Sequence, residues 1–275
     1  MASMTAPLRR VLVRRPATAG DWDAAGWRVP DPVALERQHE AFCELLAGLG
    51  AHVEVAPAID GLVDAVYMHD PLVMTPRGGI PLRMRKPVRA REPGHAAAEL
   101  ERLGVPVLGT LPDGAYADGG DRFWLDERTM AVGLGYRTNR AGAEALAALA
   151  DPIAVDTYDL PHDRGPAHVL HLQSFLSAVT EDLCVVFEPL APVRLLEDLR
   201  ARDIDWVAID RESYDAMGCN VLAVRPGVAV MVAGAARVRR ELERRGVEVH
   251  VYDGSELSLK GDGGPTCLTA PLLRN

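Results

Sequence analysis

The sequence predicts a compact α/β protein, and three observations support this fold class. Hydrophobic residues make up 48% and charged residues 25% of the 275 positions, which is ordinary globular usage and allows one large domain or two small ones. A helical pattern followed by a short apolar strand recurs about five times. No Pro/Ser-rich linker or low-complexity tract divides the chain, so we expect a single domain over residues 1–275.

Short apolar runs with β-branched residues, bounded by Gly, Pro or Asp, are typical of strands. They occur at 10–15, 52–57, 65–75, 130–135, 153–160, 182–190, 206–210, 220–234 and 247–253. The run at 220–234 carries Pro226 and Gly227 near its middle, which predicts a hairpin rather than a parallel crossover. A simple doubly wound parallel sheet is therefore disfavoured.

Five segments have apolar residues at helical spacing. They lie at 33–50, 94–104, 139–150, 192–202 and 235–245. The first ends in Gly50, Asn139 is available as the N-cap of the third, and the fourth opens with Pro192. The fifth is basic and continues through Gly246 into an apolar strand.

The charge balance is acidic, with a net charge of −9 and a pI of about 5.4. A general nucleic-acid-binding protein would show a basic face, so we expect no nucleic-acid partner. An acidic cleft would instead attract a small cationic substrate. The apolar run near residue 12 is too short for a secretory signal, and no run is long enough to span a membrane. We therefore expect a cytoplasmic protein without a membrane partner.

The four cysteines are widely scattered and form no CxxC pair. They are Cys43, Cys184, Cys219 and Cys267. This usage fits a reduced cytoplasm better than a disulfide framework or a zinc site. No GxGxxG or GxxxxGK(S/T) motif follows a strand, so no nucleotide cradle is indicated. We expect neither a metal nor a cofactor.

Polar groups stand out in four segments, at 64–71, 118–121 with Arg137 shortly after, 168–174 and 260–271. In the last of these, Cys267 follows Gly263 and Gly264, which permit positive φ and close approach of the backbone to a ligand. Exposed backbone N–H groups there would stabilise a thiolate or a charged intermediate. A Cys with a His elsewhere in the chain is also a known nucleophile–base pattern.

Each of these signals, taken alone, has an ordinary structural explanation. Free cysteines are usually buried and inert. A histidine in an apolar run such as that around His171 is more often a core residue with satisfied hydrogen bonds. Asp70 before Pro71 and Asp118 before Gly119 are also common turn pairs.

Taken together, the segments resemble the guanidino-modifying superfamily of dimethylarginine dimethylaminohydrolases, arginine deiminases and amidinotransferases. The resemblance runs through nearly the whole chain and rests on six motifs in order. They are YMHDP at 67–71, DGGD at 118–121, YRTN at 136–139, LHLQS at 170–174, GCNVLAV at 218–224 and KGDGGPTCL at 260–268. Order and spacing agree with the dimethylarginine hydrolase type, since the chain lacks room for the helical insertion common in arginine deiminases.

The resemblance implies a five-bladed, pseudo-symmetric α/β propeller with the site at its centre. By motif position, Cys267 matches the nucleophile, His171 the general acid and base, and Asp118 a catalytic carboxylate that is Glu in many relatives. The resemblance also implies a set of substrate-binding residues: Asp70 at the guanidinium, Asp64 near the α-amino group, Arg89 and Arg137 at the α-carboxylate, and Tyr67 and His69 within the YMHDP motif. Arg85 and Arg91 are alternatives to Arg89.

The chain departs from the family pattern at His69, where many relatives have an acidic residue. The resemblance implies hydrolysis of arginine or an N-methylated arginine through a covalent Cys267 thiouronium, giving a ureido product such as citrulline. Alternatives are an amidinotransferase, a ribosome-binding propeller without catalysis, and a degenerate inactive propeller. The oligomeric state stays open, with a homodimer as one option.

Overall fold

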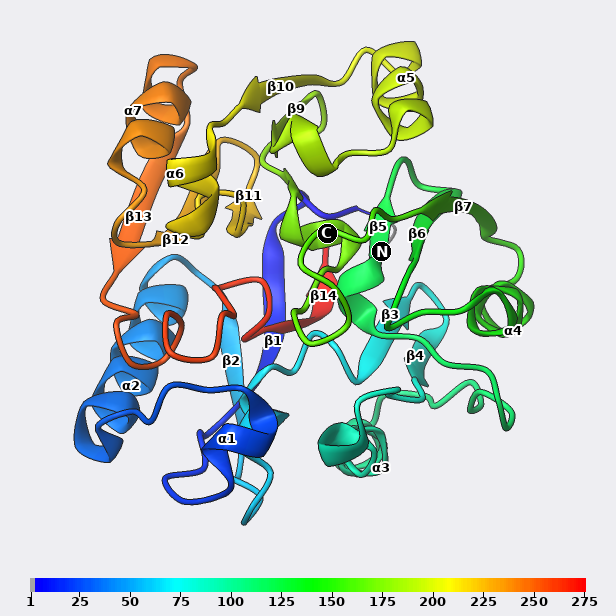
Figure 1. Ribbon diagram of the computed structural model, residues 1–275, viewed down its shortest axis with the longest axis vertical. Coiled ribbons are helices and arrows are strands. Elements are labelled where there is room, and N and C mark those ends of the chain that lie inside the picture. The colour runs from blue at the N-terminus through cyan, green and yellow to red at the C-terminus, as the bar shows by residue number, and fades with distance from the viewer. Residues whose placement is uncertain (1–2) are drawn as a thin grey trace.

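The computed structural model describes residues 3–275 and shows a mixed α/β fold with five small sheets. The sheets surround the centre of the molecule, and the long helices lie outside them (Figure 1). In hydrogen-bonded order, the sheets are β14 (Ala270–Arg274), β1 (Leu8–Arg14) and β2 (His52–Ala56); β3 (Leu72–Thr75) and β4 (Gly78–Pro81); β5 (Arg122–Trp124), β6 (Thr129–Leu134) and β7 (Ala154–Asp159); β10 (Asp205–Ala208), β9 (Leu183–Val186) and β8 (Leu176–Ala178); and β11 (Val221–Arg225), β12 (Val228–Val232) and β13 (Glu248–Tyr252).

Seven α-helices connect or flank these strands within the described residues. They are α1 (Trp22–Ala25), α2 (Pro32–Gly48), α3 (Glu92–Arg102), α4 (Arg140–Ala150), α5 (Val193–Ala201), α6 (Arg211–Asp215) and α7 (Ala236–Arg244). The five segments predicted as helices correspond to α2, α3, α4, α5 and α7. The short helices α1 and α6 were not predicted, because four or five residues are too few to show a period.

The same local unit recurs around the molecule: an antiparallel strand pair, a helix, and a third strand parallel to the second. In one unit β11 and β12 are antiparallel, α7 follows, and β13 pairs in parallel with β12. The units built on α4 and α5 repeat this order. The hairpin predicted at Pro226 and Gly227 is therefore confirmed, and so is the absence of a doubly wound sheet.

Two sheets vary this scheme. In the β3–β4 sheet, the parallel third strand is reduced to a single bridge between Gly79 and Val107. In the sheet around β1, the antiparallel partner is β14, from the other end of the sequence, while β2 pairs in parallel after α2. The first and last described segments thus lie together in one sheet.

Helix caps explain where two of the long helices begin. The Asp31 carboxylate accepts a hydrogen bond from the Ala34 amide at 2.8 Å and so caps α2. The Asn139 side chain accepts from the Gly142 amide at 2.8 Å and caps α4, which confirms the cap predicted from the sequence.

The strand predicted over 65–75 is wrong in its first half. Residues Val63–Val66 form a short 3₁₀ helix, η1, and a turn follows before β3 begins at Leu72. The turn is fixed by the His69 amide, which donates to the Cys267 carbonyl at 3.0 Å instead of joining a sheet ladder. Pro71 lacks an N–H and could not take part in a ladder.

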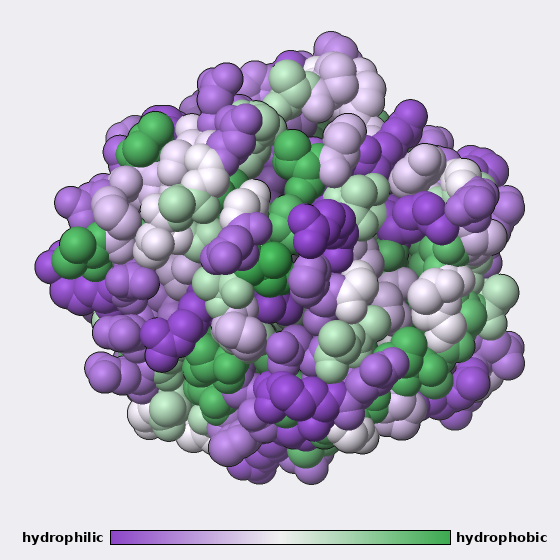
Figure 2. Space-filling model, turned by 90° about the horizontal axis from the view of Figure 1, so that it is seen from below, coloured by the Kyte–Doolittle hydropathy of each residue, from purple (hydrophilic) through white to green (hydrophobic). Residues whose placement is uncertain are grey.

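Buried apolar side chains form four clusters, and the largest contains Phe175 and Phe187. The view from below shows a mostly hydrophilic face with small apolar groups scattered over it (Figure 2). Between residues 3 and 275, no helix combines the length and apolar character needed to cross a membrane.

Candidate active site

A buried histidine stands between two buried carboxylates at the centre of the site. His171 Nε2 lies 3.0 Å from Asp118 Oδ2, and His171 Nδ1 lies 3.9 Å from Asp70 Oδ1. Each of the three side chains is at most 6% exposed. Asp118 precedes the 3₁₀ helix η3 (Gly119–Asp121) and His171 precedes η4 (Leu172–Ser174), so short helices fix both residues at their N-termini.

The neighbouring carboxylates favour the protonated form of the His171 imidazole. Burial alone would lower the pKa of His171, but Asp70, Asp121 and Asp118 outweigh burial and raise the pKa above its ordinary value. Burial also opposes ionisation of Asp70, yet Arg89, His171 and His69 bring the pKa of its carboxyl down to about 2. The site therefore holds a protonatable imidazole beside an ionised carboxylate at neutral pH.

In Asp70 and in Asp118, only one of the two carboxylate oxygens has a hydrogen-bond partner within the described residues. Asp70 Oδ2 accepts from Arg89 at 2.6 Å, and Asp118 Oδ2 accepts from Arg137 at 3.2 Å as well as facing His171. Asp70 Oδ1 and Asp118 Oδ1 are buried and have no hydrogen-bond partner among residues 3–275. Buried acceptors without partners are costly, so both oxygens are suited to a ligand that donates N–H groups.

Of Arg89 and its two alternatives, Arg85 and Arg91, the structure brings only Arg89 to the carboxylates. Its side chain is 4% exposed and is held by Asp70 and by Glu92, whose Oε2 lies 2.7 Å from Nη2. Arg85 and Arg91 are exposed. Arg89 thus holds Asp70 in place, with all its closest partners inside the protein.

Cys267 lies beside this cluster. Its thiol sulfur lies 3.2 Å from Asn220 Nδ2, and its carbonyl accepts from the amide of His69, the residue before Asp70. Burial, followed by the nearby Asp70 carboxylate, raises the pKa of the Cys267 thiol to about 12, which Asn220, the Gly264 amide and Arg89 only partly offset. Asp70 is therefore a neighbour of both His171 and Cys267.

The glycines before Cys267 act through close approach rather than through positive φ. The positive φ in this turn belongs to Asp262, at 57°, so Gly263 and Gly264 do not use the positive φ that glycine permits. A Cβ on Gly264 would lie 2.5 Å from Asn220 Cγ, and one on Gly263 would overlap the Tyr67 ring. Glycine is needed here because side chains of the site occupy the space.

Two more of the predicted substrate-binding residues are Asp64 and Tyr67. Both make their contacts with other side chains of the protein. Asp64 accepts from Trp27 Nε1 at 2.7 Å and pairs with Lys86 Nζ at 2.6 Å. The Tyr67 ring stacks on Trp27 with centroids 5.4 Å apart, and its buried hydroxyl has no partner within residues 3–275. Asp64 lies 4.0 Å from the Arg89 guanidinium, so it belongs to the same charge cluster.

His69 is buried with both ring nitrogens in use. Nδ1 lies 3.2 Å from the Thr269 carbonyl, to which it donates, and Nε2 accepts from Gln173 Nε2 at 2.8 Å. Burial, reinforced by Arg122, lowers the pKa of His69 to about 3, so the ring is neutral. A neutral His69–Gln173 pair thus stands where the family pattern has an acidic residue, and it leaves His69 no free nitrogen for a substrate.

Three further residues of the site received no role from the sequence. Asn220 contacts the Cys267 sulfur, Glu92 holds Arg89, and Asp121 accepts from the Leu172 amide at 3.0 Å and from Thr138 Oγ1 at 2.6 Å. Asn220 and Asp121 lie within the GCN and DGGD motifs, which could have drawn attention to them. Glu92 had no such signal, because it opens an ordinary helix.

No group of three or more His, Cys, Asp or Glu side chains within residues 3–275 is arranged to hold a metal ion.

Gly120→Ala is expected to lower activity roughly 10- to 100-fold, by the general cost of displacing a catalytic group by about an ångström. The added Cβ would lie 2.5 Å from His171 Nδ1 and 3.1 Å from Asp70 Oδ1, so one of the two must move. Gly94→Ala is the control, because a Cβ there meets no atom within 4 Å and the residue lies in α3. Equal activity of both variants would show that this contact does not position the histidine.

Sequence comparison identifies arginine deiminases as relatives. The arginine deiminase family model matches residues 200–274. Arginine deiminase of Rhodococcus erythropolis is 31% identical over 193 residues, which are 58% of this chain and 47% of that protein. The chain thus spans about half the length of such relatives. An uncharacterized protein of Aeropyrum pernix is 27% identical over 86% of this chain and 83% of its own length.

Solved structures of two hydrolases share the fold of this chain. DDAH from Pseudomonas aeruginosa, complexed with citrulline, has a TM-score of 0.81 and 21% identity and covers 98% of this chain and 100% of its own. The N-terminal domain of ArgZ, a cyanobacterial arginine dihydrolase, has a TM-score of 0.84 and 18% identity, with 96% and 97% coverage. The resemblance read from the six motifs is confirmed by these matches.

Proposed function

We propose that this chain, which resembles the guanidino-modifying superfamily, is a cysteine hydrolase of arginine or an N-methylated arginine. The observation that carries the proposal is the pair of buried, unpartnered carboxylate oxygens, Asp70 Oδ1 and Asp118 Oδ1, around His171 and near Cys267. The hydrolase relatives support the same reaction class.

A guanidinium group would satisfy both oxygens at once. It carries N–H donors in one plane and a delocalised positive charge, and charge-assisted hydrogen bonds to carboxylates are the strongest of their kind. Two carboxylates on its edges would fix the central carbon relative to the thiol of Cys267. Arg89 would hold the Asp70 carboxylate through Oδ2, and Arg137 would hold the Asp118 carboxylate in the same way.

The cationic substrate would also help to activate the nucleophile. In the free protein the thiol is protonated at neutral pH, since its pKa is raised to about 12. A positive charge beside the sulfur favours the thiolate and lowers that pKa. Cys267 would thus become a reactive thiolate when the cationic substrate is bound.

The reaction then has two halves. The Cys267 thiolate bonds to the guanidinium carbon, His171 gives its proton to one nitrogen, and that nitrogen leaves as ammonia or an alkylamine. A thiouronium remains on Cys267. In the second half His171 removes a proton from water, the oxygen bonds to the same carbon, the C–S bond breaks, and the ureido product leaves while the sulfur is reprotonated.

The fold would serve this chemistry as one unit. We propose that residues 1–275 form a single domain and that the five sheets are the blades of a pseudo-symmetric propeller. The reactive groups come from segments that follow different blades, at Asp70, Asp118, His171 and Cys267.

The proposal is tested by incubating the protein with arginine, monomethylarginine, dimethylarginine and simpler guanidines, and by measuring ureido product and released amine. We expect equal amounts of both products from at least one arginine derivative without an added acceptor. Ornithine formed only with an added amine would identify an amidinotransferase instead. No turnover of any guanidine, together with binding to ribosomal subunits, would favour a binding protein.

Alkylation of Cys267 by iodoacetamide should speed up about tenfold for each pH unit from 7 to 9, since the thiolate fraction rises tenfold per unit below the pKa. The thiol pKa is raised to about 12, so no plateau is expected in this range. Mass spectrometry of the Cys267 peptide gives the rate. A rate that levels off near pH 7 would mean that the free protein already holds a thiolate.

A further inference from the structure

Two buried arginines face a small cavity that the proposed reaction does not use. The cavity has a volume of about 30 Å³. Its polar lining comes from Ser3, His69, Arg122, Thr266, Thr269 and Arg274. No Asp or Glu lines it. The cavity is separate from the two unpartnered carboxylate oxygens of the candidate active site.

Arg122 has no counter-charge within the described part of the chain. The residue is 6% exposed, and its buried Nε has no hydrogen-bond partner among residues 3–275. Burial alone lowers the pKa of its guanidinium to about 10, and no carboxylate acts in the opposite direction. A buried charge is costly unless it is paired, so this guanidinium needs a partner.

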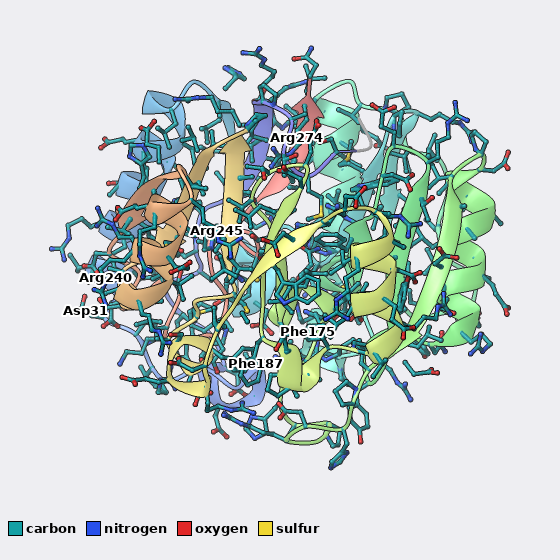
Figure 3. All side chains as sticks on the ribbon, turned by 90° about the horizontal axis from the view of Figure 1, so that it is seen from above. Asp31, Phe175, Phe187, Arg240, Arg245 and Arg274 are labelled. Atoms are coloured by element: carbon teal, nitrogen blue, oxygen red, sulfur yellow. The ribbon has the colours of Figure 1, made fainter. Side chains whose placement is uncertain are left out.

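Arg274 adds a second positive charge to the same cavity. It is also 6% exposed, and it donates to the carbonyls of Ala6 at 2.7 Å and Ala223 at 2.8 Å. Burial and then the charge of Arg122 lower its pKa to about 9. In Figure 3, Arg274 lies on β14, the strand paired with β1.

Arg89, a third buried arginine, differs in that it is paired with carboxylates. Its guanidinium, equally buried, has Asp70 at 2.6 Å and Glu92 at 2.7 Å. Arg122 and Arg274 are also buried and line one cavity with like charges, and the only described hydrogen-bond acceptors are the carbonyls that Arg274 contacts. The cavity therefore lacks a negative charge to balance Arg122 and Arg274.

We propose that this cavity is a binding site for one small monovalent anion, of halide or carboxylate chemistry, held between Arg122 and Arg274. A volume of about 30 Å³ is enough for a small species, since a cavity needs roughly 10–15 Å³ to hold one water; it suits one halide or a formate and excludes phosphate esters and nucleotides. The hydroxyls of Thr266 and Thr269 already donate to backbone carbonyls, so the guanidinium groups are the donors for the anion.

The small cavity borders a larger cavity on one side and the residue before Asp70 on another. A larger cavity of about 440 Å³ shares four lining residues with the small one: Ser3, Met4, Trp124 and Ala178. On another side, His69 lines the small cavity and directly precedes Asp70. The neutral ring of His69 therefore separates the anion from the carboxylate that would hold the substrate.

Thermal unfolding at constant ionic strength tests the site. Sodium gluconate, whose anion is too large for the cavity, is replaced stepwise by sodium bromide or sodium formate. We expect the Tm of wild type to rise with the logarithm of anion concentration above Kd, by roughly 5 °C at an anion concentration ~100-fold above Kd. Arg122→Met should lose the response, whereas Arg240→Met, on the exposed face of α7 (Figure 3), should keep it.

The stability of the protein without a small anion gives a second test of the unpaired charge on Arg122. In gluconate alone, Arg122→Met should be at least as stable as wild type, because the variant removes an unpaired buried charge. A titration of Tm with bromide and formate that is identical in wild type and Arg122→Met would overturn the proposal.

Bromide soaking of wild-type crystals gives a test that needs no variant. We expect an anomalous peak in the cavity between the Arg122 and Arg274 guanidinium groups. No peak there, combined with a wild-type Tm that responds to neither bromide nor formate, would overturn the proposal whether or not Arg122→Met folds. Both measurements are independent of turnover, so they stand apart from the outcome of the guanidine screen.

Discussion

Cys267→Ser is expected to abolish guanidine turnover, with a fall in kcat on the order of 10⁴-fold or more, as for other enzymes that lose their nucleophile. The hydroxyl of serine is a far weaker nucleophile than a thiolate at the same position. The side chain is similar in size, so its contact with Asn220 at 3.2 Å can be kept. Ureido product formation by purified variant and wild type measures the effect.

The control for this change is Cys43→Ser. Cys43 is a partly buried thiol on α2 whose pKa burial raises to about 11, and its sulfur lies 3.8 Å from His39 Nδ1 rather than beside Asp70. We expect near wild-type turnover from it. If Cys267→Ser has an unchanged Tm and still turns over substrate at a substantial rate, Cys267 is not the nucleophile.

His171→Ala is expected to lower kcat roughly 10²- to 10⁴-fold, the usual contribution of a general acid and base. The imidazole lies 3.0 Å from Asp118 and 3.9 Å from Asp70, so its loss removes the group that would carry protons in both halves of the reaction. The thiouronium on Cys267 should then accumulate, and intact-mass spectrometry of quenched samples would detect it.

His168→Ala is the matched control, since this exposed histidine lies three residues earlier on the same segment. Its turnover should match wild type, and no adduct should accumulate. Wild-type turnover by His171→Ala would remove His171 from the proton-transfer role, whatever the result with Cys267→Ser.

Local patterns predicted much of the fold. The caps at Asn139 and the hairpin at Pro226 and Gly227 follow from short-range chemistry, and both are present. The strands β4, β5 and β8 escaped notice because each has only three or four residues, and β4 consists of Gly, Gly, Ile and Pro. Their pairing is decided by tertiary contacts that a sequence window does not contain.

The candidate site was predicted by motif order and refined by geometry. Asp70, Asp118 and His171 come together as expected, and Cys267 lies beside Asp70. The sequence could not show that Arg89 is held by Glu92, because that contact depends on how α3 is placed. It also could not show that His69 pairs with Gln173, which lies 104 residues away.

The pairing of β1 with β14 has a consequence for synthesis on the ribosome. A chain translated only as far as residue 260 lacks both Cys267 and β14, so the edge of β1 is left open while its apolar residues are already in place. Such an unpaired edge is prone to join other chains. The strand that covers the edge of β1 and the proposed nucleophile are therefore synthesised within a few residues of each other, and an unfinished chain has neither.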